Sequence, residues 1–244
     1  MLIKVINPNT TRSMTERIGR CAAAVASPGT RIDAVNPSMG PASIESHYDE
    51  ALSVPGLLDE IDRGERDGVD GYVIACFGDP GLAAARELAR GPVVGIAEAA
   101  MRTAAYLGRG FSVVTTLGRT RGRAWDLAAE YGVERFCRNV RACEVAVLDL
   151  ELPGSRAREL IVAECRLALA QDHADVLVLG CAGMADLAAE ISAMLDVPVV
   201  DGVAAATRTV ESLVALGLRT GAREEYAPPP AKKYTGLLGE FAVV

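Results

Sequence analysis

The sequence predicts an α/β protein with two similar lobes, each built on a parallel sheet. Short apolar runs rich in valine and isoleucine alternate with segments of helical period, and glycine, proline or aspartate bounds most of these runs. This alternation is typical of strand–helix units in a parallel sheet. One long stretch also occurs twice in the chain. We therefore expect two lobes related by a pseudo-twofold axis, with a ligand site in the cleft between them.

The apolar runs qualify as strands, and the segments between them follow helical spacing. The predicted strands are Ile3–Ile6, Arg31–Val35, Gly71–Ala75, Val93–Gly95, Phe111–Thr115, Cys143–Val147, Val176–Gly180 and Val199–Val200. The predicted helices are Ser13–Val25, Ser53–Arg66, Leu82–Arg90, Ala97–Leu107, Arg119–Tyr131, Ser155–Gln171, Asp186–Leu195 and Val203–Leu216.

The repeat matches Gly71–Thr103 with Asp175–Thr209. Each copy contains, in order, an apolar strand, a cysteine, a glycine, a helix with Leu-Ala-Ala, a Pro-Val-Val strand and an Arg-Thr pair. The offset is 105 residues between Cys76 and Cys181, and it grows to 106 at the Pro-Val-Val segments. Two matched cysteines thus occupy the same place in the two halves.

The first strands of the two halves also correspond, although more loosely. Val5–Thr11 and Val113–Gly118 both end in small polar residues. We expect residues 1–97, completed by the C-terminal segment 203–244, to form the first lobe, and residues 98–202 to form the second lobe.

Composition excludes several classes of function. The net charge of −7 and the pI near 5.0 oppose binding to nucleic acid. No apolar run is long enough for a membrane span or a signal peptide, so we expect a cytoplasmic protein without a membrane partner. Six cysteines without a Cys-x-x-Cys pair indicate reduced thiols and no zinc site. Two histidines and three lysines favour neither a metal site nor a pyridoxal phosphate Schiff base, so we expect no metal and no cofactor.

Cys76 and Cys181 each lie between the end of a strand and the start of a helix. A thiol near a helix N-terminus meets oriented N–H groups and the positive end of the helix dipole, so we expect a lowered thiol pKa. Asp79 is expected to cap the first of these helices with Pro80 at its first position, and Gly183 precedes the second.

A single cysteine at a strand end is more often core packing than chemistry. The repeat changes this balance, because packing does not require matched cysteines at the mouths of both lobes. A pseudo-twofold axis would put one thiol on each side of a bound molecule, which suits removal of a proton from one face of a carbon and delivery to the other. The remaining cysteines are interpreted as packing residues: Cys21, Cys137, Cys143 and Cys165.

Short motifs around these positions carry a family resemblance. They are Ile6-Asn-Pro-Asn-Thr10, Ala75-Cys-Phe-Gly-Asp-Pro-Gly81 and Gly180-Cys-Ala-Gly-Met184, supported by Ser38-Met-Gly-Pro-Ala-Ser43. On these residues the chain resembles the aspartate/glutamate/hydantoin racemase superfamily over nearly its whole length, and most closely its hydantoin and allantoin racemase branch. The resemblance implies that Cys76 and Cys181 are the acid/base pair, that no cofactor is used, that the substrate is a five-membered cyclic ureide, and that the chain forms a homo-oligomer.

The residues after each cysteine depart from those of the amino-acid racemases, which typically carry Asn-Thr after the first cysteine and Thr-His after the second. This chain has Phe77-Gly78 and Ala182-Gly183. An ammonium and a carboxylate need charged partners, so the departure favours a neutral ring. Loss of the ring-carbon proton places charge on the adjacent oxygen, and we expect the backbone N–H groups of Phe77, Gly78, Ala182 and Gly183 to stabilise it.

Polar side chains follow the first strand of each half. Asn7 and Asn9 on one side, and Thr115 and Thr116 on the other, are expected to bind the ring because ligands bind beyond the carboxyl ends of parallel strands. The alternative for the asparagines is a simple turn.

Apolar walls are expected from Phe77, whose alternative is a core position, and from Ile44 in a Gly/Pro-bordered loop. His47 and Tyr48 are interpreted as surface or loop-packing residues.

Other functions remain open. A decarboxylase or a cis–trans isomerase of dicarboxylates would fit the same superfamily, but few cations flank the loops. A non-catalytic two-lobed binding protein has no need of paired thiols, and a thiol hydrolase lacks an evident histidine partner. Allantoin is favoured over 5-substituted hydantoins because Ser46-His-Tyr-Asp-Glu50 and Thr120-Arg-Gly-Arg-Ala-Trp125 resemble that subgroup most.

Overall fold

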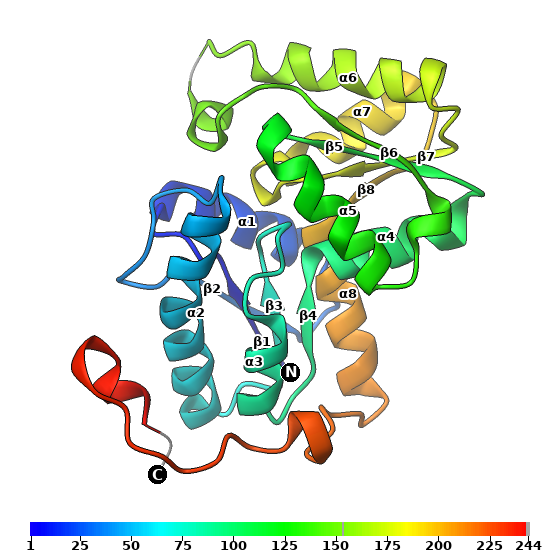
Figure 1. Ribbon diagram of the computed structural model, residues 1–244. Coiled ribbons are helices and arrows are strands. Elements are labelled where there is room, and N and C mark those ends of the chain that lie inside the picture. Colours follow the sequence, from blue (N-terminus) through cyan, green and yellow to red (C-terminus); the bar gives the residue numbers. More distant parts are fainter. Residues whose placement is uncertain (153, 243–244) are drawn as a thin grey trace.

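A computed structural model describes residues 1–152 and 154–242, and it contains two halves with the same order of elements (Figure 1). The first half comprises β1 (Leu2–Ile6), α1 (Arg12–Val25), β2 (Arg31–Val35), α2 (His47–Asp67), β3 (Gly71–Ile74), α3 (Leu82–Leu88), β4 (Val93–Gly95) and α4 (Ile96–Leu107). The second comprises β5 (Phe111–Thr115), α5 (Arg121–Glu130), β6 (Cys137–Ala142), α6 (Ala157–Gln171), β7 (Val176–Leu179), α7 (Ala188–Leu195), β8 (Val199–Asp201) and α8 (Gly202–Ala215). Short 3-10 helices include η1 (Gly118–Thr120), η2 (Glu134–Phe136), η3 (Val147–Glu151), η4 (Ala182–Leu187), η5 (Glu224–Tyr226) and η6 (Gly236–Phe241).

Each half forms a four-stranded parallel sheet, and the two sheets have equivalent strand orders. The first is ordered β2-β1-β3-β4 and the second β6-β5-β7-β8. The inner strands β3 and β7, with sequences GYVI and VLVL, are buried at every residue, as expected for strands covered on both faces. The predicted fold class of two similar α/β lobes is confirmed.

The last helix of each half packs on the sheet of the other half. Helix α4 follows β4 of the first sheet, yet it packs against β5, β7 and β8 of the second. Helix α8 follows β8 of the second sheet and packs against β1, β3 and β4 of the first. The two helices also pack against each other, so the centre of the molecule is a pair of exchanged helices (Figure 1).

One predicted strand is wrong. Residues Cys143–Val147 were expected to be extended, but the strand is Cys137–Ala142, and the chain turns at Glu144, which has a φ of 54°. Strand β6 lies at the edge of its sheet and pairs only with β5, so it tolerates the exposed Arg138 and lacks an apolar run. The apolar residues that follow are buried for another reason, because they pack beyond the end of the sheet.

Helix α2 begins six residues before the predicted start at Ser53. The Ser46 hydroxyl caps it by accepting the N–H of Asp49 at 3.1 Å, and Glu50 adds a second acidic residue to the first turn. Pro55 lies inside the helix, beyond its first turn. The extra turn brings residues from before Ser53 towards the second half of the molecule.

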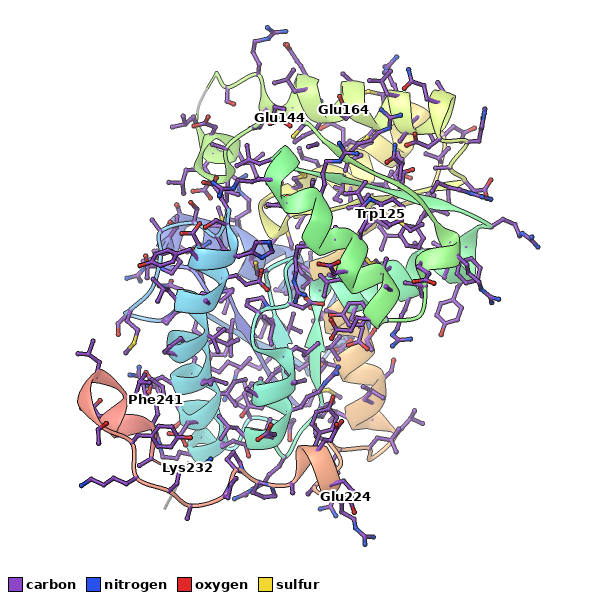
Figure 2. The ribbon with its side chains drawn as sticks, viewed as in Figure 1. Trp125, Glu144, Glu164, Glu224, Lys232 and Phe241 are labelled. Atoms are coloured by element: carbon purple, nitrogen blue, oxygen red, sulfur yellow. The ribbon has the colours of Figure 1, made fainter. Side chains whose placement is uncertain are left out.

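The remaining segment, after α8, runs along the outside of the first half, past the ends of α3 and α2 (Figure 1). Lys232 and Phe241 lie on it, whereas Trp125 projects from α5 at the other side of the molecule (Figure 2). Among residues 1–152 and 154–242, no helix combines the length and the apolar character needed to cross a membrane.

Candidate active site

A cleft lies between the two sheets, beyond the carboxyl ends of β1, β3, β5 and β7, where parallel α/β sheets bind ligands. Its lining comes from both halves: Asn7, Asn9, Met14, Ile44, Glu45, Ser46, His47, Glu50, Ala75, Cys76, Phe77, Gly78, Thr115, Thr116, Arg119, Thr120, Arg123, Ala124, Val147, Gly180, Cys181 and Ala182. Every residue predicted to bind the ligand is in this set except Gly183, and both predicted thiols are in it.

The two cleft thiols occupy equivalent places. Cys76 follows β3, and Cys181 follows β7 and precedes η4. Both side chains are partly exposed to the cleft, whereas Cys137, Cys143 and Cys165 are buried. Burial raises the pKa of Cys76 most, and a negative charge on Cys181 raises it further.

The direction of the thiol pKa shifts is opposite to the prediction. Burial raises the pKa of Cys76 to about 12 and that of Cys181 to about 11. Hydrogen bonds from the N–H groups of Gly78 and Gly183 to the respective sulfurs lower these pKa values, but by less than desolvation raises them. Both cysteines therefore rest as neutral thiols.

Gly183 donates a hydrogen bond to the Cys181 thiol and does not line the cleft. Its N–H group is the one that bonds Cys181, and a Cβ atom there would lie 2.9 Å from Leu150 Cδ1 and 3.7 Å from the Cys181 sulfur. Gly78 lines the cleft but also donates its N–H to a sulfur. Two of the four expected oxyanion donors are thus used within the protein. The Phe77 N–H, in contrast, bonds no acceptor within the described part of the chain.

Asp79 does not cap the helix that follows it, contrary to the prediction. Helix α3 begins at Leu82 with Gly81 as its N-cap, and the Asp79 carboxylate instead accepts N–H bonds from Ala97 and Glu98 in the first turn of α4. Local spacing favours a cap on the next helix, but the left-handed Asp79 backbone, with φ of 46°, turns the carboxylate away from α3.

The two asparagines differ in how free their amides are. Asn7 is buried, and its Nδ2 donates to Asn9 Oδ1 at 2.8 Å and to Thr15 Oγ1 at 3.0 Å. Asn9 Oδ1 also accepts the Thr11 N–H at 2.9 Å, whereas Asn9 Nδ2 contacts only the Met14 sulfur, at 3.4 Å, among the described residues. Asn7 therefore holds the turn together, and Asn9 keeps amide donors for the cleft.

The threonines show the same division. Thr115 Oγ1 lies 3.1 Å from Thr120 Oγ1 and donates to the Gly180 carbonyl at 3.2 Å, which ties β5 to the residue before Cys181. The Thr116 hydroxyl has no hydrogen-bond partner among residues 1–152 and 154–242 and lines the cleft. Thr116 is thus the better placed of the two to meet a ligand.

Charged residues at the cleft were missed by the sequence argument. Arg123 of α5 pairs with Glu50 of α2 at 3.1 Å and donates to the Gly78 carbonyl at 2.8 and 3.2 Å. Glu45 accepts the Val147 N–H at 2.6 Å. These contacts join the two halves across the cleft, and their partners are so far apart in the sequence that no local pattern signals them.

His47 is exposed, as expected for a surface or loop-packing residue, and it also lines the cleft. Tyr48 is 73% exposed and lies outside the lining. Among the described residues, no cluster of three or more histidine, cysteine, aspartate or glutamate side chains is arranged to hold a metal ion.

Comparison with known proteins places this site in a family. The sequence model described as Asp/Glu/Hydantoin racemase matches residues 3–210. The chain belongs to this family. It is 49% identical to a hydantoin racemase of Rhizobium meliloti, over 97% of this chain and 98% of that protein. It is 47% identical to a hydantoin racemase of Pseudomonas sp. (strain NS671), over 99% of this chain and 97% of that protein.

A solved structure is about as similar to this chain as these two relatives are. An allantoin racemase from Klebsiella pneumoniae superposes with a TM-score of 0.97 at 50% identity, covering 99% of each chain. The protein is therefore an isomerase of the racemase type. The sequence resemblance to this family is confirmed.

Proposed function

We propose that the protein racemises a five-membered cyclic ureide without a cofactor, by proton transfer between the ring carbon and two cysteine thiols. The observation that carries this proposal is the equivalent placement of Cys76 and Cys181 in one cleft, at the ends of β3 and β7. A proton must leave one face of the carbon and reach the other, and a single group cannot easily serve both faces.

In the reaction, one sulfur is a thiolate and the other a thiol. The thiolate takes the proton from the ring carbon, the electron pair of the C–H bond moves into the adjacent carbonyl as an enolate, and the opposite thiol donates its proton to the other face of the carbon. The raised pKa values of Cys76 and Cys181 suit a weak carbon acid, since a desolvated thiolate binds a proton more strongly than a solvated one. The roles of the sulfurs reverse for the other enantiomer.

The enolate oxygen needs donors, and two backbone groups support this role. The Phe77 N–H bonds no acceptor in the described chain, and the Ala182 N–H is the first of η4, where helical N–H groups have no partner within the helix. One such preorganised donor contributes on the order of 3 kcal/mol to a transition state. Asn9 and Thr116 add side-chain donors for the ring.

We infer that allantoin is the preferred substrate. Its ureido substituent both donates and accepts hydrogen bonds, which matches the charged and polar side chains of Glu50, His47 and Arg123 at the cleft. A 5-substituted hydantoin is the second candidate, favoured by the apolar Ile44 and Val147 in the same lining. The names of the relatives support both, because both allantoin and hydantoin racemases are among them.

The test compares single enantiomers of allantoin and of an alkyl hydantoin. We expect purified protein to abolish the optical rotation of both enantiomers of allantoin faster than that of the hydantoin, relative to protein-free samples that correct for spontaneous racemisation. A higher kcat/KM for the alkyl hydantoin would reverse the substrate assignment. Absence of catalysed rotation change with either compound would reject the proposed function.

The mechanism has its own test in heavy water. Cys76→Ser and Cys181→Ser are each expected to stop racemisation, because a serine hydroxyl is far too weak an acid or base. Each variant should still exchange the ring-carbon proton of one enantiomer, and the two should prefer opposite enantiomers. Cys165→Ser, which changes a buried thiol outside the cleft, is the matched control and should keep racemising. Near-normal racemisation by either cleft variant would disprove the two-thiol mechanism.

A further inference from the structure

Asp79 is a buried carboxylate beside a cleft thiol, and it contacts three parts of the fold. It is 3% exposed, and Oδ1 and Oδ2 accept the N–H groups of Ala97 and Glu98 at 3.1 and 2.9 Å. Oδ2 also accepts the hydroxyl of Tyr131, at the end of α5, at 2.6 Å. Three donors therefore fix one carboxylate, and charge-assisted bonds of this kind are among the stronger ones in proteins.

The same residue closes the turn that carries Cys76. The Asp79 N–H donates to the Cys76 carbonyl at 3.0 Å, and the intervening Gly78 donates its N–H to the Cys76 sulfur. A fixed Asp79 carboxylate thus fixes the backbone of the turn, and the turn fixes the sulfur. Tyr131 belongs to the second half of the chain, so a residue of the second half holds the turn of the first.

A break in the repeat shows that this arrangement is not simply how the fold caps its helices. The Pro-Val-Val strands of the two copies are followed by Gly95 and by Asp201. In the second copy Asp201 caps α8 itself, by accepting the N–H groups of Val203 and Ala204 at 3.0 and 2.9 Å. In the first copy the equivalent position is glycine, and a Cβ atom there would overlap the Asp79 carboxylate.

In the first half, therefore, the side chain that caps α4 comes from the turn of Cys76 and not from the strand end. Helix α8 is capped without any connection to Cys181, whereas α4 is capped by a residue three positions after Cys76. Capping alone would be satisfied by an aspartate at position 95. Placing the carboxylate at Asp79, with glycine making room, couples the turn of one thiol to α4 and to Tyr131.

We propose that Asp79 and Tyr131 are positioning residues for Cys76, and that their hydrogen bond holds this thiol in its working place from the opposite half of the molecule. The proposal rests on the proposed function for its kinetic consequence, but the position of the Cys76 turn is measurable without catalysis. A misplacement of a reacting group by about 1 Å costs about 100-fold in rate.

The experiment compares two conservative variants of buried tyrosines. Tyr131→Phe removes the hydroxyl that donates to Asp79, and Tyr72→Phe removes a matched hydroxyl that donates to Glu65 at 2.8 Å, away from the cleft. Asp79→Asn is a second test variant, because the asparagine amide replaces one accepting oxygen by an NH2 group that faces the donors of Ala97, Glu98 or Tyr131 and cannot accept from them. For each protein, mass spectrometry follows the rate at which iodoacetamide labels Cys76 and Cys181 in the same molecule.

We expect Tyr131→Phe to speed labelling of Cys76 at least about threefold, with Cys181 unchanged, because only the Cys76 turn is released. Asp79→Asn should also speed it, but loss of the Asp79 charge lowers the pKa of Cys76 as well, so Tyr131→Phe, which keeps that charge, decides the labelling test. The kcat of both variants should fall at least about tenfold with KM within about twofold, as expected for a lost reaction geometry. Tyr72→Phe should show neither effect. This selectivity for one thiol is a readout that general destabilisation would not produce.

Three results would overturn the proposal: unchanged Cys76 labelling in Tyr131→Phe, an equal change at Cys76 and Cys181 in that variant, or the same effects in Tyr72→Phe. Wild-type protein that fails to racemise either ureide rejects the proposed function instead. The labelling ratio would then still decide whether Asp79 and Tyr131 position Cys76.

Discussion

Racemisation by this protein is expected to accelerate steeply as the pH rises. Burial raises the pKa of Cys76 to about 12 and that of Cys181 to about 11, so both are neutral thiols at neutral pH. The proposed reaction needs one thiolate as base and one thiol as acid. Since both pKa values lie above the assay range, each rise in pH populates the reactive form and leaves the acid protonated.

The size of the effect follows from these pKa values. For a thiol with a pKa of about 11, the thiolate fraction is about 0.0001 at pH 7 and about 0.01 at pH 9. The kcat/KM for the free enzyme should therefore rise by about tenfold per pH unit, or about 100-fold across this interval. A thiol at its ordinary pKa of about 8.5 would give a profile that levels off within the interval.

The assay is the initial rate of optical-rotation loss as a function of pH, corrected at each pH for the protein-free rate. Ultraviolet absorbance of thiolate is titrated in parallel, and Cys76→Ser and Cys181→Ser identify which absorbance step belongs to which thiol. Cys165→Ser is the control, because it removes a buried thiol that does not line the cleft. A flat kcat/KM profile, or ionisation of either cleft thiol below about pH 8, would refute the reasoning.

Two stability predictions follow from buried contacts away from the cleft. Gly64→Ala should lower the free energy of unfolding by about 1–3 kcal/mol, because a Cβ atom would lie 2.6 Å from Tyr72 Cε1. Gly122→Ala in α5 should raise it by about 0.5–1 kcal/mol, because a Cβ atom there has no neighbour within 4 Å. Thermal unfolding of both variants checks this, and equal shifts of the unfolding temperature would count against it. Glu211 accepts four hydrogen bonds, which lower its pKa to about 2, so its contribution is present above the unfolded pKa of about 4.3 and is lost as the pH falls towards 2. Glu211→Gln should lower the free energy of unfolding, measured in urea at neutral pH, by roughly 2 kcal/mol, and the stability of this variant should fall less steeply as the pH drops. Glu16→Gln, at an exposed glutamate, is the control and should change the free energy of unfolding by less than about 0.5 kcal/mol. Equal losses in the two variants would contradict the role of Glu211.

The sequence predicts the repeated architecture because burial on both faces forces apolar runs onto the inner strands. The same rule fails at β6, where an edge strand needs no such run and the apolar stretch after it packs beyond the sheet. The matched cysteines are visible in the sequence because a duplicated element repeats at a constant offset. Residues such as Arg123 and Glu50 are invisible, because only the packing of distant helices brings them together.

Two expectations about local electrostatics and capping were wrong for related reasons. Asp79 is spaced to cap α3, but its partners lie 18 and 19 residues further along the chain, on α4. The thiols were expected to be acidic because each precedes a helix, yet the surroundings that bury them act more strongly on their pKa values than the few N–H groups that face them. Spacing along the chain shows which groups are neighbours, whereas the degree of desolvation depends on the whole fold.

The exchange of α4 and α8 determines when each sheet is completed during synthesis. The first three strands of the first sheet leave the ribosome early, but α8, which covers β1, β3 and β4, lies near the other end of the chain. Until residues 202–215 emerge, the apolar face that receives Val203, Ala206 and Val210 has no cover of its own. Contacts between segments so distant slow folding and prolong the exposure of apolar surface. The nascent first half is therefore the stage at which this chain depends most on protection from aggregation.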